Sequence, residues 1–479
     1  MTTLTMKFGG TSVGSPEAIR QTANIIKASL ADNNRVIVVL SAMSGVTDLL
    51  LKSAHAAIDS DKWTYMSINE TIREKHEEVV NMLIDPGEER EAILKTISDL
   101  LDQQLELCEA INILNEATPR ILDAILSFGE RLSCRVIAAI LQVDSINAKA
   151  YDSSNFIVTN RNYQNAEPIW SETETHIHNK LLPEIENGIT PIITGFIGST
   201  PDGTITTLGR GGSDFSAAIF AANTDSNELI IWTDVDGVMT ADPRLDKRAR
   251  VLPYVSYQEV GELAFYGAKV LHPKTVQPII NRDIPMRVRN TFNPSHEGTL
   301  IGAEMAPSKT IIKAVTSINN VSMLTVSGKG MLGVPGIVGR TFIATANAGA
   351  SILMISQSSS EQSFCFTVID QKADTVKNAV EKELAREIHQ QDVDSVEVLS
   401  DIVIITVVGA GMRGTPGVAG RVFTVMGNSR LNVLAIAQGS SECSISFIVK
   451  EEDLKKAVVI LHDLALETVE NGFKNGELA

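Results

Sequence analysis

The 479-residue sequence is poor in cysteine and in positive charge, and each shortage excludes a class of protein. It has four cysteines, widely spaced and without a Cys-x-x-Cys pair: Cys108, Cys134, Cys365 and Cys443. This usage argues against a disulfide framework or a cysteine-based metal site and is typical of a reduced, cytoplasmic protein. With 41 Lys and Arg against 58 Asp and Glu, the formal net charge is −17, which makes nucleic acid a poor partner.

Long apolar runs are also missing. Residues 1–6 are polar and lead directly to Lys7, so we expect no signal peptide. The apolar runs are far shorter than the roughly 20 residues that cross a bilayer, so we expect no membrane contact. The length corresponds to roughly three domains of about 150 residues each.

Two similar units near the start predict an α/β fold. Residues 4–8 and 35–40 have the pattern of buried strands, and each is followed by a glycine-containing loop and a helix. In the first unit Ser15 is the expected N-cap, and Pro16 suits the first helical position. This order predicts a mainly parallel sheet with helices on both faces and ligand-binding loops at its carboxyl edge.

Residues 206–214, Thr-Thr-Leu-Gly-Arg-Gly-Gly-Ser-Asp, combine a glycine loop, a guanidinium group and a helix start. We expect Ser213 or Asp214 to cap a helix over 215–222, so that free N–H groups face an anion. Arg210 adds a planar fork that suits a carboxylate or phosphate. An ordinary Gly-Gly turn is the alternative.

Two further stretches combine acidic residues with glycine. Residues 65–141 are strongly helical, with breaks near Pro86 and Pro119, and they place Glu130 inside an apolar pattern. A solvent-exposed helix face is the alternative for that glutamate. After a buried strand over 228–232, acidic residues and glycine suit a nucleotide with hydrated Mg²⁺. Two successive turns would explain the same spacing.

The last third of the chain contains an internal repeat. Residues 334–342 match residues 415–423 at an offset of 81, and the same offset pairs Gln357 with Gln438. Each copy predicts a small βαββαβ module, and two such modules are expected to pack side by side.

Both copies also contain Gly-x-Gly-x-x-Gly, which makes an NAD(P)-binding oxidoreductase an alternative. The glycines concerned are Gly328, Gly330 and Gly333, and then Gly409, Gly411 and Gly414. A proline directly behind the glycines, a glutamine instead of an acidic residue after the next strand, and a length of about 80 residues all argue against it.

Together, these motifs resemble the aspartate kinases. The long helical stretch before Phe128 resembles the monofunctional archaeal-like type, and because the chain ends soon after the second module, we expect no homoserine dehydrogenase half. The resemblance covers nearly the whole chain and rests on Lys7-Phe8-Gly9-Gly10-Thr11-Ser12, Ser41-Ala42-Met43-Ser44-Gly45-Val46-Thr47, Phe128-Gly129-Glu130-Arg131, Gly209-Arg210-Gly211-Gly212-Ser213-Asp214, Thr233-Asp234, Asp242-Pro243-Arg244 and Lys269-Val270-Leu271-His272-Pro273. It implies an amino-acid-kinase domain over 1–300 and ACT (ferredoxin-like) modules over 311–393 and 400–472.

The resemblance implies ATP-dependent phosphorylation of the β-carboxylate of L-aspartate, the first step towards lysine, threonine and methionine. Lys7, Arg210 and Asp214 are then the candidate catalytic residues. The aspartate pocket would comprise Ser41, Thr47, Glu130, Arg210, Gly211, Gly212 and Ser213. The ATP site would comprise Lys7, Gly9, Gly10, Thr233, Asp234, Met239, Asp242, Arg244 and Lys269, without protein ligands to a metal beyond the Mg²⁺ of the nucleotide.

For regulation, the resemblance implies feedback inhibition through the ACT modules, with threonine favoured over lysine. The effector residues would be Met331, Pro335, Gly336, Ile337, Gln357 and Gln438. We expect a homodimer or homotetramer formed through these modules. The remaining alternatives are a non-catalytic amino-acid sensor and, within the same fold, a glutamate or N-acetylglutamate kinase.

Overall fold

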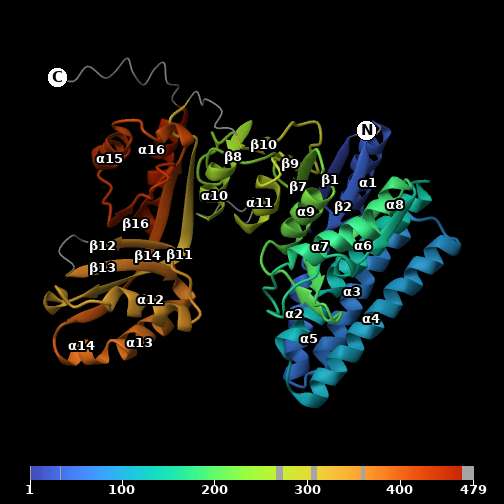
Figure 1. Ribbon diagram of the computed structural model, residues 1–479, viewed down its shortest axis with the longest axis horizontal. Coiled ribbons are helices and arrows are strands. Elements are labelled where there is room, and N and C mark those ends of the chain that lie inside the picture. Colours follow the sequence, from blue (N-terminus) through green and yellow to red (C-terminus); the bar gives the residue numbers. More distant parts are fainter. Residues whose placement is uncertain (1, 33, 266–272, 304–309, 358–361, 467–479) are drawn as a thin grey trace. The chain divides into compact units, whose positions relative to one another are not determined.

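The computed structural model describes residues 2–32, 34–265, 273–303, 310–357 and 362–466, and the chain divides into two compact units (Figure 1). The first unit comprises Met1–Val238, Pro253–Tyr257 and Val270–Glu304. The second comprises Met239–Leu252, Gln258–Lys269 and Met305–Ala479. The domain boundaries predicted from the sequence stay predictions, and two segments from the first 300 residues belong to the second unit.

The first unit is built on an eight-stranded sheet in the order β3-β4-β2-β1-β7-β9-β10-β8. Every neighbouring pair is parallel except β9 and β10. The strands are β1 (Thr3–Phe8), β2 (Arg35–Leu40), β3 (Ala148–Tyr151), β4 (Thr190–Thr194), β7 (Glu228–Thr233), β8 (Tyr254–Ser256), β9 (Met286–Asn290) and β10 (Thr299–Gly302). A separate hairpin consists of β5 (Ile197–Ser199) and β6 (Ile205–Thr207).

Helices cover both faces of this sheet, as the sequence predicts. They are α1 (Pro16–Ala31), α2 (Val46–Ile58), α3 (Lys62–Leu83), α4 (Glu88–Leu114), α5 (Pro119–Leu126), α6 (Phe128–Val143), α7 (Trp170–His176), α8 (Leu182–Glu186), α9 (Gly212–Asn223) and α11 (Pro273–Ile280). Alternate residues of β1 point to opposite faces. Met6 and Phe8 pack into the core beneath α1 and α6, whereas Lys7 meets α9 on the other face.

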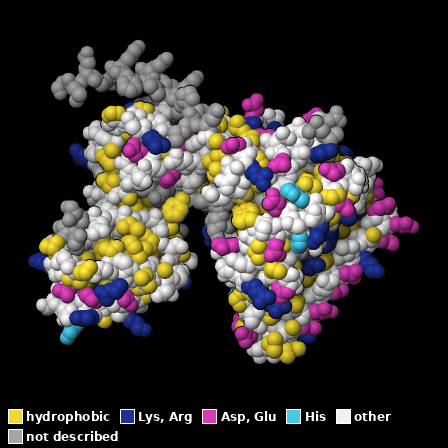
Figure 2. Space-filling model, viewed as in Figure 1, with side chains coloured by type: hydrophobic (Ala, Val, Ile, Leu, Met, Phe, Trp, Pro, Cys, Tyr) yellow, Lys and Arg dark blue, Asp and Glu magenta, His cyan; other side chains and the backbone are white. Residues whose placement is uncertain are grey.

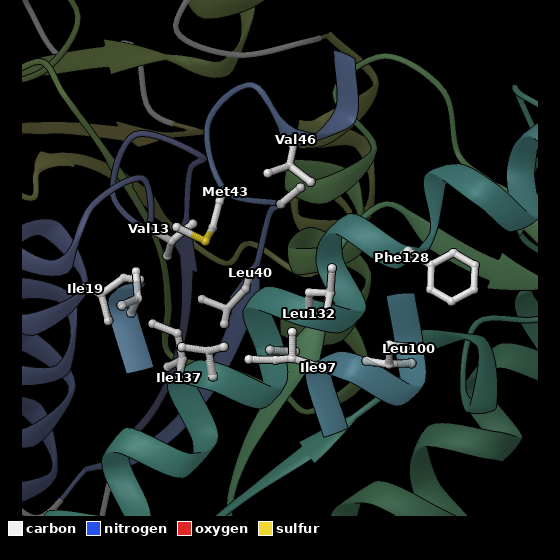
Figure 3. Packing of buried hydrophobic residues seen from close by; sticks show 14 of the residues in the cluster. Val13, Ile19, Leu40, Met43, Val46, Ile97, Leu100, Phe128, Leu132 and Ile137 are labelled. Carbon is white, nitrogen blue, oxygen red and sulfur yellow. The ribbon is translucent and has the colours of Figure 1, made fainter. Parts of the chain in front are cut away.

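The core on the α6 face joins the sheet to the long helices. Figure 3 shows Leu40 of β2, Ile97 of α4 and Leu132 of α6 among the side chains that meet there, and all three are fully buried. Each such side chain stabilises the fold by about 1.5–3 kcal/mol relative to exposure. On the solvent side, Figure 2 shows acidic side chains along α4, in keeping with the net negative charge.

The second unit contains a six-stranded antiparallel sheet in the order β12-β13-β11-β14-β16-β15. Its strands are β11 (Ala314–Ser327), β12 (Met354–Gln357), β13 (Ser363–Ile369), β14 (Ser395–Val408), β15 (Ala435–Ala437) and β16 (Ser444–Lys450). Its helices are α10 (Tyr257–Phe265), α12 (Ile337–Asn347), α13 (Ala373–Glu383), α14 (Ala385–His389), α15 (Val418–Asn428) and α16 (Leu454–Leu466).

The two repeats interleave through their long first strands. The second half of β11 pairs with β13 of its own copy, whereas its first residues, from Ala314, pair with the end of β14. In the same way, the first residues of β14 pair with the end of β11. The fourth strand of each βαββαβ module is therefore the beginning of the other copy's first strand.

The glycine repeats serve this packing. A Cβ on Gly328 would lie 2.1 Å from the carbonyl oxygen of Asp392, and one on Gly409 would lie 2.3 Å from that of Ile311. Glycine is required because another part of the same backbone passes over it. The space next to these glycines is thus filled by the chain itself, which argues against the dinucleotide alternative. Among the described residues, no helix is both long and apolar enough to cross a bilayer.

Candidate active site

A cavity of about 580 Å³ opens beside the loops that follow β1, β2 and β4 in the first unit. All the predicted catalytic and aspartate-binding residues line it, together with Gly10: Lys7, Ser41, Thr47, Glu130, Arg210, Gly211, Gly212, Ser213 and Asp214. Segments more than 200 residues apart in the sequence thus meet at the carboxyl edge of the sheet, where α/β proteins bind ligands. The roles assigned to these residues stay predictions.

Lys7 and Asp214 form an ion pair at the cavity wall. The Lys7 Nζ lies 2.6 Å from Asp214 Oδ1, and both side chains are largely buried. Asp214 lies in the first turn of α9, where the helix dipole favours an anion. The aspartate therefore holds the ammonium group of Lys7 in the cavity.

The prediction that Ser213 or Asp214 caps α9 is wrong. The helix begins at Gly212, and its N-cap is Gly211, in the left-handed conformation at φ 73° and without a side-chain cap. Gly209 is also left-handed, at φ 76°. Because glycine adopts these angles at little cost, the chain turns sharply and starts the helix earlier. Asp214 is then free to pair with Lys7.

Glu130 is a buried acid on α6. Its side chain is almost fully inaccessible, and burial raises the pKa of the Glu130 carboxyl to about 8 against the opposing effects of backbone amides and Lys7. Among the described residues, its Oε2 has no hydrogen-bond partner. An unsatisfied carboxyl oxygen in a cavity is suited to a cationic ligand group.

Gly129 explains how Glu130 reaches the cavity. A Cβ on Gly129 would lie 2.7 Å from the Cβ of Ala42, closer than carbon atoms can approach without a shift. The glycine therefore lets α6 pack directly against the loop after β2. The neighbouring glutamate is thereby brought to the cavity instead of the helix surface.

Arg210 is exposed at the mouth of the cavity, on the loop between β6 and α9. Among the described side chains, its guanidinium group makes no ion pair. The loop packs closely against the backbone of Gln164, since a Cβ on Gly209 would lie only 2.9 Å from the Gln164 carbonyl oxygen. The guanidinium group is thus available to an anionic ligand.

Part of the predicted ATP site lies at the same edge of the sheet. β1 and β7 are adjacent and parallel, and the Gly9 N–H donates to the Trp232 carbonyl oxygen at 3.1 Å. Gly9 therefore lies beside Thr233, the last residue of β7, and Asp234 follows it as an exposed side chain.

The other predicted ATP residues are not brought into the first unit. Met239, Asp242 and Arg244 belong to the second unit, and Arg244 pairs with Asp242 at 2.6 Å. Lys269 lies outside the described residues.

The predicted effector residues divide into two kinds. The side chains of Met331 and Ile337 belong to the apolar core of the first repeat. Gly336 is the left-handed N-cap of α12, and Pro335 beside it is exposed. Gln357 ends β12 and Gln438 follows β15, and both are exposed. These strands are the two ends of the strand order and do not pair, but they come into contact, since Ser356 Oγ donates to the Ile436 carbonyl oxygen at 3.1 Å.

Several cavity residues were missed by the sequence analysis. Gln164 and Phe196 line the cavity but lie in no motif, and Thr207 lies in the stretch 206–214 but was assigned no role there. Phe196 adopts a left-handed conformation at φ 67°, which is sparsely populated for a phenylalanine and costs about 1–3 kcal/mol. No local sequence signal distinguishes Gln164 and Phe196 from ordinary loop and strand positions.

Comparison with known proteins assigns a family to each part of the chain. Residues 2–290 match the amino acid kinase family, and residues 324–384 and 405–464 each match the ACT domain. The chain is 36% identical to the bifunctional aspartokinase/homoserine dehydrogenase 1 of Arabidopsis thaliana, over 95% of this chain and 50% of that protein. It is 33% identical to chloroplastic aspartokinase 1 of the same plant, over 97% of this chain and 80% of the relative.

Solved structures agree with the sequence relatives. Aspartokinase III of E. coli, crystallised with aspartate and ADP, superimposes with a TM-score of 0.81 at 29% identity, over 97% of this chain and 100% of that one. The same enzyme with lysine and aspartate gives a TM-score of 0.79 at 30% identity, over 97% and 99%. The chain spans about half the length of the bifunctional plant relatives that it matches.

Proposed function

The chain belongs to the aspartokinases of the amino acid kinase family, and we propose that it transfers the γ-phosphoryl group of ATP to the β-carboxylate of L-aspartate, giving 4-phospho-L-aspartate. One observation carries this proposal: a single cavity combines the Lys7 ammonium, the unsatisfied Glu130 carboxyl and the Arg210 guanidinium. These groups complement the charges of an amino acid with an acidic side chain and of a phosphoryl donor.

The chemistry explains why both signs of charge are needed. The β-carboxylate and the γ-phosphate repel each other, so fixed cations and N–H groups must offset their repulsion in the transition state. Lys7 stabilises the charge that develops on the transferring phosphoryl group. Asp214 fixes the position of Lys7 through their ion pair.

The substrate L-aspartate is bound through its α-ammonium group and a carboxylate. Arg210 binds a carboxylate of the substrate bidentately, and Glu130 receives the α-ammonium group. Ser41, Thr47, Gly211, Gly212 and Ser213 complete the pocket through hydroxyl and backbone N–H groups. An arriving ammonium group offsets the burial that keeps Glu130 protonated, so Glu130 is ionised in the complex.

The nucleotide lies along the ends of β1 and β7. Gly9 and Gly10 approach its phosphates, with Thr233 and Asp234 beside them, and Met239, Asp242, Arg244 and Lys269 complete its site. Among the described residues, no group of three or more His, Cys, Asp or Glu side chains could hold a metal ion. Mg²⁺ bound mainly by phosphates needs only one or two carboxylates, and the exposed Asp234 fits that requirement. Bound Mg²⁺ would neutralise part of the phosphate charge.

The two alternatives differ from this proposal in simple assays. A non-catalytic sensor would bind amino acids without ADP formation, and a glutamate or N-acetylglutamate kinase would prefer the longer substrate. Coupled ADP release is therefore measured with aspartate, glutamate and N-acetylglutamate in turn. The proposal requires turnover that depends on aspartate, and preference for either glutamate substrate would overturn it.

We propose that residues 1–300 form the catalytic kinase domain. The two repeats, over 311–393 and 400–472, are the proposed regulatory domains. An amino-acid effector binds near Gln357 and Gln438, and a neutral glutamine suits the hydroxyl of threonine better than the side-chain ammonium of lysine. The enzyme catalyses the first step towards lysine, threonine and methionine in the cytoplasm. It assembles as a homodimer or homotetramer through these modules.

A further inference from the structure

Asp123 forms a buried hydrogen-bonding centre beneath the cavity. Its side chain, on α5, is fully buried. Thr207 Oγ1 donates to Oδ1 at 2.7 Å, and the Thr207 N–H donates to Oδ2 at 3.0 Å. The Gln164 N–H is shared between Oδ1 at 3.2 Å and Oδ2 at 3.0 Å. One carboxylate thus collects three donors from two distant segments.

Both segments held by Asp123 line the cavity. Thr207 is the last residue of β6, and the chain continues through Leu208 and Gly209 to Arg210. The Leu208 N–H donates to the Phe196 carbonyl oxygen at 2.9 Å, so the strand end is fixed on its other side as well. The backbone of Gln164 packs against Gly209. The base of the Arg210 loop therefore rests on the carboxylate of Asp123.

The same element also leads to Glu130. Helix α5 ends at Leu126, and α6 begins at Phe128. Asp123 therefore joins the helix pair that carries the buried glutamate to the loop that carries the exposed arginine.

We propose that Asp123 is a positioning residue for aspartate binding: its carboxylate fixes the spacing between Arg210 and Glu130, which hold the two ends of the substrate. This inference rests on the proposed function. A carboxylate suits the place because it only accepts hydrogen bonds and all three of its partners donate. In an asparagine, one –NH₂ group would face a donor in either orientation, although the side chain has the same shape.

Steady-state kinetics separate positioning from a general loss of fold. In Asp123→Asn the KM for aspartate should rise about 10- to 100-fold, because a displacement of about 1 Å costs that much, whereas the KM for ATP should change less than about twofold. Thr207→Val removes one donor and should give a smaller rise with the same selectivity. Thr207→Ser restores the hydroxyl and should recover most of that loss.

Thr173→Val is the matched control. Thr173 is fully buried, and its Oγ1 accepts from the Val158 N–H at 3.1 Å, so it also anchors a loop, but neither residue lines the cavity. It should lose stability without a change in the KM for aspartate. Equal increases in both KM values for Asp123→Asn, or the same KM increase for Thr173→Val, would overturn the inference.

Hydrogen exchange separates this inference from the proposed function. Without any substrate, Asp123→Asn should speed exchange at least tenfold in the segment 205–212, and Thr173→Val should not. Should Asp123→Asn fail to fold, Thr207→Val is measured in the same way. Wild-type protein that forms no ADP with aspartate would reject the function alone, whereas unchanged exchange in 205–212 would reject the role of Asp123.

Discussion

The protonation states of the cavity residues depend on burial as much as on neighbouring charged groups. Lys7 is compensated by Asp214 at 2.6 Å, but Glu130 has no such partner for its Oε2 among the described residues. The attraction of Lys7 acts to lower the pKa of Glu130, yet desolvation is larger and raises it. Near neutral pH the free site therefore contains the ion pair of Lys7 with Asp214 and a protonated Glu130. The ammonium group of a bound ligand would favour the ionised form of Glu130.

Lys7→Met tests the residue at the phosphoryl group. Removing a cation directed at developing charge should lower kcat roughly 100- to 1,000-fold while the protein stays folded. The coupled ADP-release assay measures the rate, and circular dichroism checks the fold. Lys27→Met is the control, because Lys27 also pairs with an aspartate, Asp144, but on the exposed surface. A near-normal kcat for Lys7→Met would remove Lys7 from the mechanism.

Glu130 should make aspartate binding depend on pH. With a pKa of about 8 the free carboxyl is protonated at pH 7, and the bound ammonium group ionises it, so close to one proton should be released per aspartate bound. Affinity should then rise about tenfold per unit as pH increases from 6 towards 8. Calorimetry in two buffers of different ionisation enthalpy measures the release. Proton release that persists in Glu130→Gln would contradict this origin.

At the scale of single elements, local sequence signals predicted much, and distant partners were missed. Ser15 caps α1 as expected, accepting from the Ala18 N–H. The breaks between α3 and α4 and between α4 and α5 occur near Pro86 and Pro119 as expected, but the further break at Ser127, between α5 and α6, was not predicted. The start of α9 was misplaced because two left-handed glycines, and not a side chain, begin it. Asp123 was missed because its partner Thr207 lies 84 residues away. The pairing of β11 with β14, by which each repeat supplies a strand to the other, was likewise not predicted, because the repeat in the sequence does not show which strands pair.

Gly129→Ala tests the close contact between α6 and the loop after β2. The added methyl group meets Ala42, so the protein should lose about 1–3 kcal/mol of stability and the KM for aspartate should rise as Glu130 moves. Gly420→Ala in α15 is the control, because nothing beyond the neighbouring backbone of its own helix lies within 4 Å of the new Cβ. That change should be stabilising by about 0.5–1 kcal/mol. Urea unfolding gives both values, and equal effects of the two substitutions would refute the contact.

At the scale of the whole molecule, two segments within the residues that match the amino acid kinase family belong to the second unit. Glu259 of α10 is fully buried, contacts Lys313 Nζ at 2.9 Å and accepts the Ala410 N–H at 2.6 Å, at the glycine loop of the second repeat. Thr240 hydrogen-bonds to His462 of α16 at 2.8 Å. Met239, Asp242 and Arg244 lie in the segment that contains Thr240. Within the second unit, the segment with these three residues is therefore hydrogen-bonded to the repeats.

Gln357→Ala tests the proposed inhibition by threonine through the repeats. Threonine inhibits if it binds a low-activity arrangement of the repeats more tightly than the active one, and a coupling of about 1–3 kcal/mol is enough. Without the amide of Gln357, threonine should bind more weakly, so its half-inhibitory concentration should rise roughly fivefold or more, while uninhibited turnover stays unchanged. Gln371→Ala is the control, an exposed glutamine of the same repeat beyond the opposite end of β13. Inhibition curves are measured with threonine and with lysine. Inhibition by lysine alone, or an unchanged threonine response in Gln357→Ala, would reject the effector assignment, because a neutral glutamine at the end of β12 would then have no part in recognising the ligand.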